Sequence, residues 1–228
     1  MAELSFPVLD RGVVRLVDFM GGDQAVVQAA RVSFGRDVSH DERDRKLIFF
    51  LLANGHETPF EHSVFKFHIK CPIFVARQWF RHRIASYNEI SGRYAEMKEE
   101  FCLPAKLRTQ KARNYQYDEI AEPLNDELRQ KIAAGYQAAY HLYQELLEKG
   151  VAKEHARIVL PLSLYTQFYW TINSRSLMNF VKLRAEAHAQ FEMRQYAQVI
   201  SEIFKEKMPW THEAFMKYVV AGEKWTEE

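Results

Sequence analysis

Two segments in which apolar and polar residues alternate, set far apart in the chain, restrict how it can fold. In Ser63–Lys70 the aromatic side chains of Phe65 and Phe67 fall on one side, while lysines and a histidine fall on the other. A period of two residues is typical of a strand that is buried on one face. Leu162–Ile172 repeats the pattern, and Val13–Phe19 reads as a shorter strand. The predicted strands are therefore few and widely separated.

Most of the remaining chain has apolar residues at helical spacing, with recognisable helix ends. Ser39 to Glu42 has the form of a capping box, and Gly55 allows a left-handed C-cap. The longest pattern starts with Asn173 or Ser174 as a cap and has a weak point near Ala187–Gln190. Helices are predicted over Asp23–Val32, Asp41–Asn54, Pro72–Arg81, Leu124–Lys149, Val151–Leu160, Asn173–Lys207 and Thr211–Ala221.

The order of these elements is not the regular strand and helix alternation of a doubly wound fold. We expect an α+β protein in which long helices flank a central, mainly antiparallel sheet, and a single domain over residues 1–228. The loop after the Pro72–Arg81 helix is rich in serine, asparagine and glycine, so it is predicted to be irregular. Pro104–Pro123 reads as a polar connection.

The composition narrows the classes of function. Thirty-one basic and thirty acidic residues give a formal charge of +1, which offers no general attraction to nucleic acid or to an anionic membrane. Cys71 and Cys102 are the two cysteines, in no spacing typical of a disulfide framework or a zinc ribbon. The first residues lack the pattern of a signal peptide, and no stretch approaches about 18 uncharged apolar residues. We expect a soluble, cytoplasmic protein without a membrane or nucleic-acid polymer as partner.

Neither glycine motifs nor a metal motif explains a ligand site. The nine glycines form neither GxGxxG nor a P-loop, so arginines would have to hold any phosphate. His56, Glu57 and His62 do not have the HExxH spacing, and Pro59 interrupts the helix that such a site needs. We therefore expect no bound metal.

The densest group of chemically active side chains lies between Gln78 and Arg93. It holds three arginines, a histidine, serine hydroxyls and an asparagine, with Glu89 as its one acid. Planar guanidinium forks and directional donors are what phosphates and pyrimidine edges require. A solvated basic loop is one alternative. A nucleic-acid-binding module, with Trp79 and Tyr87 stacking bases, is another, and the near-zero net charge counts against it.

Within this group, RHRIASYNEIS resembles the RHRxxSxNxxS signature of the flavin-dependent thymidylate synthase family at every specified position. Four more segments are similar to blocks of that family and follow the same order: GHETPFEH at 55–62, PIFVARQW at 72–79, ARIVLP at 156–161 and NSRSLMNFVKLRAEAHAQ at 173–190. The resemblance is weakest across Pro104–Pro123. It implies methylation of dUMP to dTMP, with methylenetetrahydrofolate as carbon donor, FAD as cofactor and NADPH as the reductant of FAD. The reduced flavin would supply the hydride, and no cysteine would attack the pyrimidine.

Matched position by position, the resemblance also implies which residues bind each ligand. The residues expected to contact FAD are Ser33, Thr58, Glu61, Arg81, His82, Arg83, Asn88, Asn173, Arg175, Asn179, Leu183 and His188. Those expected to bind dUMP are Gln78, Arg81, Glu89, Ile90, Ser91, Gly92, Arg93, Arg157 and Arg184. Arg184 is the expected catalytic residue, because a guanidinium against the uracil N3/O4 edge stabilises the anion formed when N3 ionises. An arginine on a helix surface is the alternative.

Helical geometry limits how the last of these segments can serve one site. At about 100° per residue, Arg175, Asn179 and Leu183 share one sector of a helix. Arg184 lies roughly 140° away from Asn179, and His188 lies roughly 180° away. Either the helix bends, or it lies between two active sites and serves each from a different face. The second alternative implies an oligomer with active sites at subunit interfaces, and the family resemblance implies a homotetramer.

Overall fold

The computed structural model describes residues 4–35, 42–111 and 116–225, and it contains one five-stranded sheet with the strand order β1-β2-β3-β5-β4. Every pair of neighbouring strands is antiparallel, as expected. The strands are β1 (Ser5–Val8), β2 (Gly12–Met20), β3 (Val64–Pro72), β4 (Ser86–Glu89) and β5 (Tyr165–Asn173). The three predicted strands correspond to β2, β3 and β5, within a few residues at each end.

The alternation read from the sequence marks the buried face of the sheet. Phe65 and Phe67 on β3 are fully buried, as are Phe168 and Trp170 on β5. Phe67 stands opposite Trp170 in the register, and their ring centroids are 5.5 Å apart. Large aromatic side chains that meet across neighbouring strands stabilise both the pairing and the register.

The prediction of an irregular loop after the third helix is wrong for β4. Ser86 pairs with Thr171 and Glu89 with Phe168, so this segment forms the edge of the sheet beyond β5. Its side chains are mostly exposed. An edge strand of polar residues carries no alternation of apolar side chains, and its pairing comes from β5. β1, at the other edge, was also absent from the prediction.

The predicted helices are present, with corrections at their ends. The helices of the described residues are α1 (Asp23–Arg31), α2 (Glu42–Ala53), α3 (Ile73–Trp79), α4 (Leu124–Glu148), α5 (Lys153–Ala156), α6 (Ser174–Arg184), α7 (Phe191–Lys207) and α8 (Pro209–Ala214). Short 3-10 turns cover Val32–Phe34, Thr58–His62 and Arg157–Val159, and a π-helical turn, Phe215–Val220, extends α8. Gly55 has the left-handed conformation, φ 69°, that its place after α2 predicts. Residues 39–41 of the predicted capping box lie outside the described residues.

The long helix predicted from Asn173 to Lys207 is two helices, α6 and α7, separated by residues 185–190. The predicted weak point is therefore real, and it begins two residues earlier than expected. The short helix predicted over Val151–Leu160 is reduced to α5 and the 3-10 turn that follows it.

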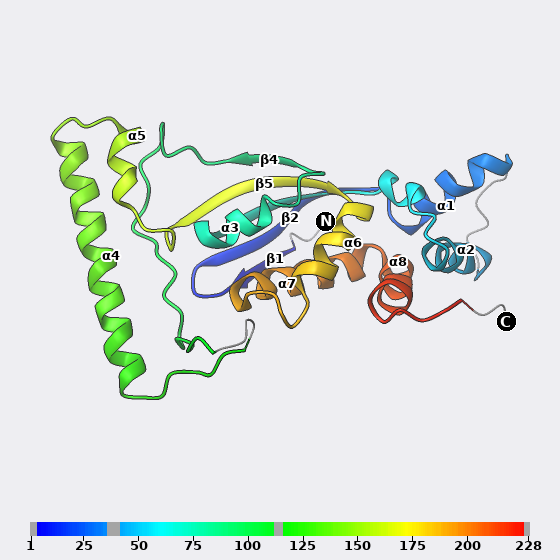
Figure 1. Ribbon diagram of the computed structural model, residues 1–228. Coiled ribbons are helices and arrows are strands. Elements are labelled where there is room, and N and C mark those ends of the chain that lie inside the picture. Colours follow the sequence, from blue (N-terminus) through cyan, green and yellow to red (C-terminus); the bar gives the residue numbers. More distant parts are fainter. Residues whose placement is uncertain (1–3, 36–41, 112–115, 226–228) are drawn as a thin grey trace.

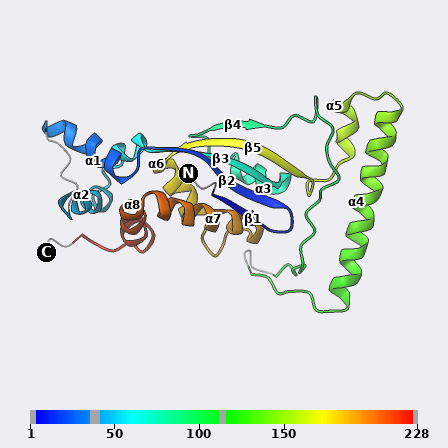
Figure 2. The same ribbon diagram turned by 180° about the vertical axis from the view of Figure 1, so that it is seen from behind.

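The helices cover one face of the sheet and extend beyond both of its ends (Figures 1 and 2). α3, α6 and α7 lie against the buried face, while α1, α2 and α8 gather at one end. α4 stands at the opposite end, where Tyr143 joins a second small core with Met97, Ala156 and Leu164. The architecture is the expected α+β fold with an antiparallel sheet.

Candidate functional site

Helix α6 begins with a side-chain cap that fixes its direction from the end of β5. The Asn173 side-chain oxygen accepts a hydrogen bond from the Ser176 amide at 2.9 Å, as the sequence predicts for an N-cap. Leu177, Phe180 and Val181 are buried against the sheet. The opposite side of the helix therefore carries its polar residues outward.

The turn after α3 is held by one tyrosine. The Tyr87 hydroxyl lies 2.7 Å from the carbonyl oxygen of His82 and 3.3 Å from that of Trp79. Trp79 itself is fully buried among aromatic rings. Because the backbone is tied down at both positions, Arg81 and Arg83 extend from a fixed turn.

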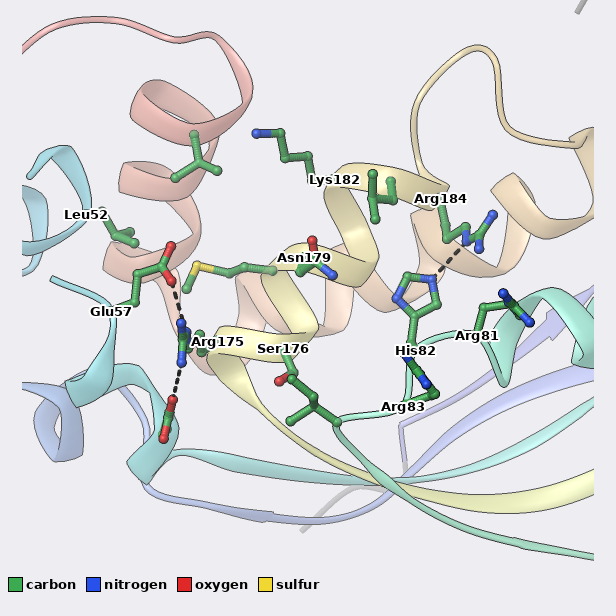
Figure 3. Close-up of a pocket in the computed structure, with 15 residues that line it drawn as sticks. Leu52, Glu57, Arg81, His82, Arg83, Arg175, Ser176, Asn179, Lys182 and Arg184 are labelled. Carbon is green, nitrogen blue, oxygen red and sulfur yellow. Dashed lines mark hydrogen bonds and ion pairs between the residues drawn. The ribbon is translucent and has the colours of Figure 1, made fainter. Parts of the chain in front are cut away.

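These two elements face each other across a cavity of about 670 Å³ (Figure 3). Arg81, His82 and Arg83 approach it from one side, and Arg175, Asn179 and Arg184 from α6 approach from the other. Its full lining is Leu52, Glu57, Glu61, Arg81, His82, Arg83, Ile84, Arg175, Ser176, Met178, Asn179, Lys182, Leu183, Arg184 and Val219.

At one end of this cavity, Arg175 lies between two carboxylates. Its Nε donates to Glu57 at 2.9 Å and its Nη1 donates to Glu61 at 2.5 Å. The hydrogen bonds with Glu61 and then Glu57 raise the pKa of Arg175. Exposed pairs of this kind add little stability, but together they fix the plane of the guanidinium.

At the other end of the cavity, Arg184 donates from Nε to Nε2 of His82 at 2.9 Å. It also donates from Nη2 to the backbone carbonyl of Gln78 at 3.2 Å. Burial, followed by the Arg184 charge, lowers the pKa of His82 to about 4. Burial also lowers the pKa of Arg184, although a guanidinium stays protonated. His82 is therefore a neutral acceptor whose ring proton sits on Nδ1, and it orients the cation without cancelling its charge.

A second cavity of about 500 Å³ shares Arg184 with the first. Gln78, His188 and Gln190 line it, together with residues of the segment after β4. That segment contributes Pro104, Lys106, Leu107, Arg108, Gln110 and Tyr117, and Ala189 completes the lining. Arg184 thus borders both cavities and lies between them.

The structure gathers most of the expected flavin residues. Seven of them border the first cavity: Glu61, Arg81, His82, Arg83, Arg175, Asn179 and Leu183. His188 borders the second cavity, Asn173 is the cap of α6, and Ser33, Thr58 and Asn88 lie outside both linings. One continuous helix from Asn173 to His188, whose two faces serve different sites, is not what the structure has. Arg184, the last residue of α6, borders the same cavity as Asn179, and the chain leaves the helix before His188.

The expected dUMP residues fall into two separate groups. Gln78, Arg81 and Arg184 border the two cavities described above. The other group consists of Glu89 at the end of β4, the residues directly after it, Ile90, Ser91, Gly92 and Arg93, and Arg157 directly after α5. α5 lies at the opposite end of the sheet from α2 (Figure 1). A Cβ at Gly92 would lie 3.1 Å from Cδ of Arg157, so these two residues are in close contact. Arg93 donates to Glu154 of α5 at 3.0 Å.

Several cavity residues were missing from the expected set. Lys182 lies three positions after Asn179, so helical spacing could have found it. Glu57 is close to Glu61 in the chain and holds the same arginine. Leu52 and Val219 come from α2 and the π-helical turn, and only the tertiary fold brings them to the site.

Two features are absent from residues 4–35, 42–111 and 116–225. These residues contain no group of three histidine, cysteine or acidic side chains that could hold a metal ion. They also contain no helix with the length and hydrophobicity needed to cross a bilayer.

The chemistry of the first cavity defines a class of protein. Five cationic side chains face two carboxylates there, which leaves an excess of positive charge beside apolar side chains such as Met178 and Leu183. Guanidinium groups fixed in this way bind phosphate oxygens and planar polar edges. The α+β fold and this cavity are therefore those of a protein that binds nucleotide-like anions.

Comparison with known proteins gives the family. A model of the family described as "Thymidylate synthase complementing protein" matches residues 15–210. The flavin-dependent thymidylate synthase of Thermosipho africanus is 54% identical over 224 residues, which cover 96% of this chain and 97% of the relative. That of Thermus thermophilus is 53% identical and covers 96% of this chain and 81% of its own. The crystal structure of the UMP/dUMP methylase PolB from Streptomyces cacaoi, bound with 5-Br dUMP, is similar with a TM-score of 0.85 and 35% identity, over 92% of this chain and 97% of that one.

This chain belongs to the flavin-dependent thymidylate synthase family. Its activity is accordingly the flavin-dependent, methyl-transferring synthesis of thymidylate. The expectation drawn from the signature residues is confirmed at this level.

Proposed function

We propose that this enzyme converts dUMP to dTMP with methylenetetrahydrofolate as carbon donor and NADPH as the reductant of a bound FAD. The observation that carries the proposal is Arg184, a guanidinium oriented by His82 in the wall between two polar cavities. The similar PolB enzyme is described as a UMP/dUMP methylase, which supports a pyrimidine nucleotide as the substrate.

The donor set of the first cavity fits FAD. Arg81, Arg83 and Lys182 can neutralise a pyrophosphate, and Asn179 can bond a polar ring edge. The volume of about 670 Å³ is sufficient for a large part of a dinucleotide. Bound there, FAD would supply the reducing equivalents that the methyl transfer requires. Ser33, Thr58, Asn88, Asn173 and His188 remain proposed flavin contacts on the family resemblance alone.

We assign to Arg184 the electrostatic activation of the pyrimidine. Its Nε and one Nη2 proton are already used by His82 and Gln78. A guanidinium carries five N–H donors, so two remain on Nη1 and one on Nη2. That edge can donate to the O4 side of uracil and stabilise the negative charge that develops when N3 ionises.

The cysteines are unsuited to act as nucleophiles on the pyrimidine. Cys71 is fully buried, and burial raises its thiol pKa well above the ordinary value. Burial also raises the pKa of Cys102 to about 11. The thiolate is the nucleophilic form, so neither thiol is available near neutral pH. This supports a mechanism without a covalent cysteine adduct.

The division of the dUMP residues supports active sites shared between subunits. Arg184 and Arg93 belong to groups at different places in one chain, so a complete site can form when two chains bring the groups together. Exposed apolar side chains, Ile84, Ile158 and Leu162, offer material for such an interface. We propose a homotetramer, as the family resemblance implies. We also propose that each subunit is a single domain and that the protein is cytoplasmic, as expected from the sequence.

A direct test begins with the purified protein. It should carry FAD, and it should form dTMP only when dUMP, methylenetetrahydrofolate and NADPH are all present. Omitting each substrate in turn provides the controls. A protein that neither retains nor binds added FAD would reject the proposal, and dTMP formed without NADPH would reject the assigned reductant.

A further inference from the structure

A chain of side-chain hydrogen bonds leads from a buried carboxylate to Gln78 at the second cavity. Glu192, in the first turn of α7, is 3% exposed. It accepts hydrogen bonds from Nη2 of Arg108 at 2.5 Å and from Nε2 of Gln190 at 2.9 Å. The carbonyl oxygen of Gln190 in turn accepts from Nε2 of Gln78.

The carboxylate determines which way each amide in this chain points. An ionised carboxylate can only accept hydrogen bonds, so Gln190 must turn its NH₂ group toward Glu192. The carbonyl of Gln190 then faces Gln78, and Gln78 must give it an N–H. The side-chain amide oxygen of Gln78 and its second side-chain N–H are left for a ligand. If the chain were inverted, Gln190 would place its carbonyl against the carboxylate, acceptor against acceptor.

Arg108 pairs with the carboxylate of Glu192. A buried carboxylate is costly unless it is paired, and the Arg108 guanidinium supplies the pair. The guanidinium also lies 5.5 Å from the ring centroid of Phe191 and 5.8 Å from that of Tyr117. Arg108 and Tyr117 come from the segment after β4, where the family resemblance is weakest. They thus hold in place the Glu192 carboxylate, which orients Gln78 at the second cavity.

We infer that Glu192, paired with Arg108, is a positioning residue that sets the polarity of Gln78 and so favours uracil over cytosine. This inference rests on the proposed function of the site. When it binds, before N3 ionises, uracil offers an N3–H donor beside its O4 acceptor. Gln78 presents the matching acceptor and Arg184 the matching donors, and both border the second cavity. Cytosine has a lone pair at N3 and an amino group at C4, so both contacts would be mismatched.

The first experiment measures dUMP and dCMP binding to the FAD-loaded enzyme by calorimetry. Glu192→Gln keeps the size of the side chain, but its amide can donate or accept, so the polarity of the chain is no longer fixed. We expect dUMP affinity to fall about tenfold, dCMP affinity to fall less, and FAD content to stay unchanged. Glu206→Gln, an exposed glutamate later on α7, is the matched control.

A double variant separates polarity from a simple structural role. In Gln190→Glu combined with Glu192→Gln, the acceptor-only group moves one step along the chain. Gln78 must again donate its N–H to position 190, so the dUMP preference should return. A residue that merely anchors α7 would not restore the nucleotide ratio in this way.

Three outcomes decide the inference. A Glu192→Gln enzyme with the parent's ratio of dUMP to dCMP affinity overturns it, and so does a double variant without recovery. If Glu192→Gln fails to fold, Gln190→Leu, at an exposed position, breaks the same chain of hydrogen bonds. An unchanged ratio of dUMP to dCMP affinity in that variant also overturns the inference. A parent enzyme that binds neither FAD nor dUMP would instead reject the proposed function.

Discussion

Replacing Arg184 by lysine tests whether the planar guanidinium, rather than its charge, is needed at the wall between the cavities. Arg184 makes two bonds to the protein, to His82 Nε2 at 2.9 Å and to the Gln78 carbonyl at 3.2 Å, while its remaining donors face the site. A lysine ammonium is a point charge that cannot span both partners and a substrate edge. At least one charge-assisted hydrogen bond is lost, with a cost of about 1.5–3 kcal/mol.

Since about 1.4 kcal/mol corresponds to a factor of ten, kcat/KM for dUMP should fall roughly 10–150-fold. The assay is dTMP formation at several dUMP concentrations, with FAD content and melting temperature measured on the same samples. Arg45→Lys is the control, because Arg45 bonds two glutamates on the outer surface of α2 and α8. An Arg184→Lys enzyme with a normal melting temperature and kcat/KM within about threefold of the parent would remove Arg184 from the catalytic role.

Three further predictions follow from the same geometry. The variant with both Cys71→Ala and Cys102→Ala should lose roughly 1–2 kcal/mol of stability yet still form dTMP, and a folded variant without product would refute a thiol-independent mechanism. Because the pKa of His82 is lowered to about 4, the unfolded chain takes up a proton below its ordinary value of 6.5 while the folded chain does not. The melting temperature should therefore decline from pH 6.5 toward pH 4, and His82→Gln should remove part of that decline. Parallel curves of melting temperature against pH for the parent and the variant would contradict the lowered pKa of His82. Finally, Arg93→Ala and Arg184→Ala chains should each be inactive alone but regain activity when co-expressed, whereas activity that stays absent in a confirmed mixed oligomer argues against shared sites.

How far the sequence predicts this fold depends on where each element gets its stability. β3 and β5 bury one face, so their alternation was visible, whereas β4 is held by pairing with Thr171 and Phe168 and has no buried face of its own. The break after Arg184 was indicated by the sequence only as a weak point near Ala187–Gln190. Residues 185–190 contain no proline or glycine, and the turn is held by contacts such as the Arg194 side chain on the Ala187 carbonyl.

The residues of the candidate site also divide into those that the sequence indicates and those that only the tertiary fold brings together. The arginines of the first cavity lie in segments whose motifs could be recognised, and a helical period could have added Lys182. Arg108 and Tyr117 come from the polar connection that showed no motif, and they reach the second cavity only because that connection folds back against α7. Long-range contacts of this kind have no local signal in the chain.

His82 has the properties required of the residue that accepts a hydrogen bond from Nε of Arg184. A partner on Nε must accept a hydrogen bond to fix the guanidinium plane, which excludes arginine and lysine. A carboxylate would also accept, but it would pair with the positive charge and weaken its effect on a developing pyrimidine anion. A neutral imidazole accepts without cancelling charge, and burial beside Phe180 together with the Arg184 charge keeps it neutral. Arg184 also ends α6, where the unpaired carbonyl groups of the last turn favour a cation. Within the part of the chain that the structure describes, the fold thus stabilises an oriented positive charge, without a carboxylate partner, at the one residue shared by both cavities.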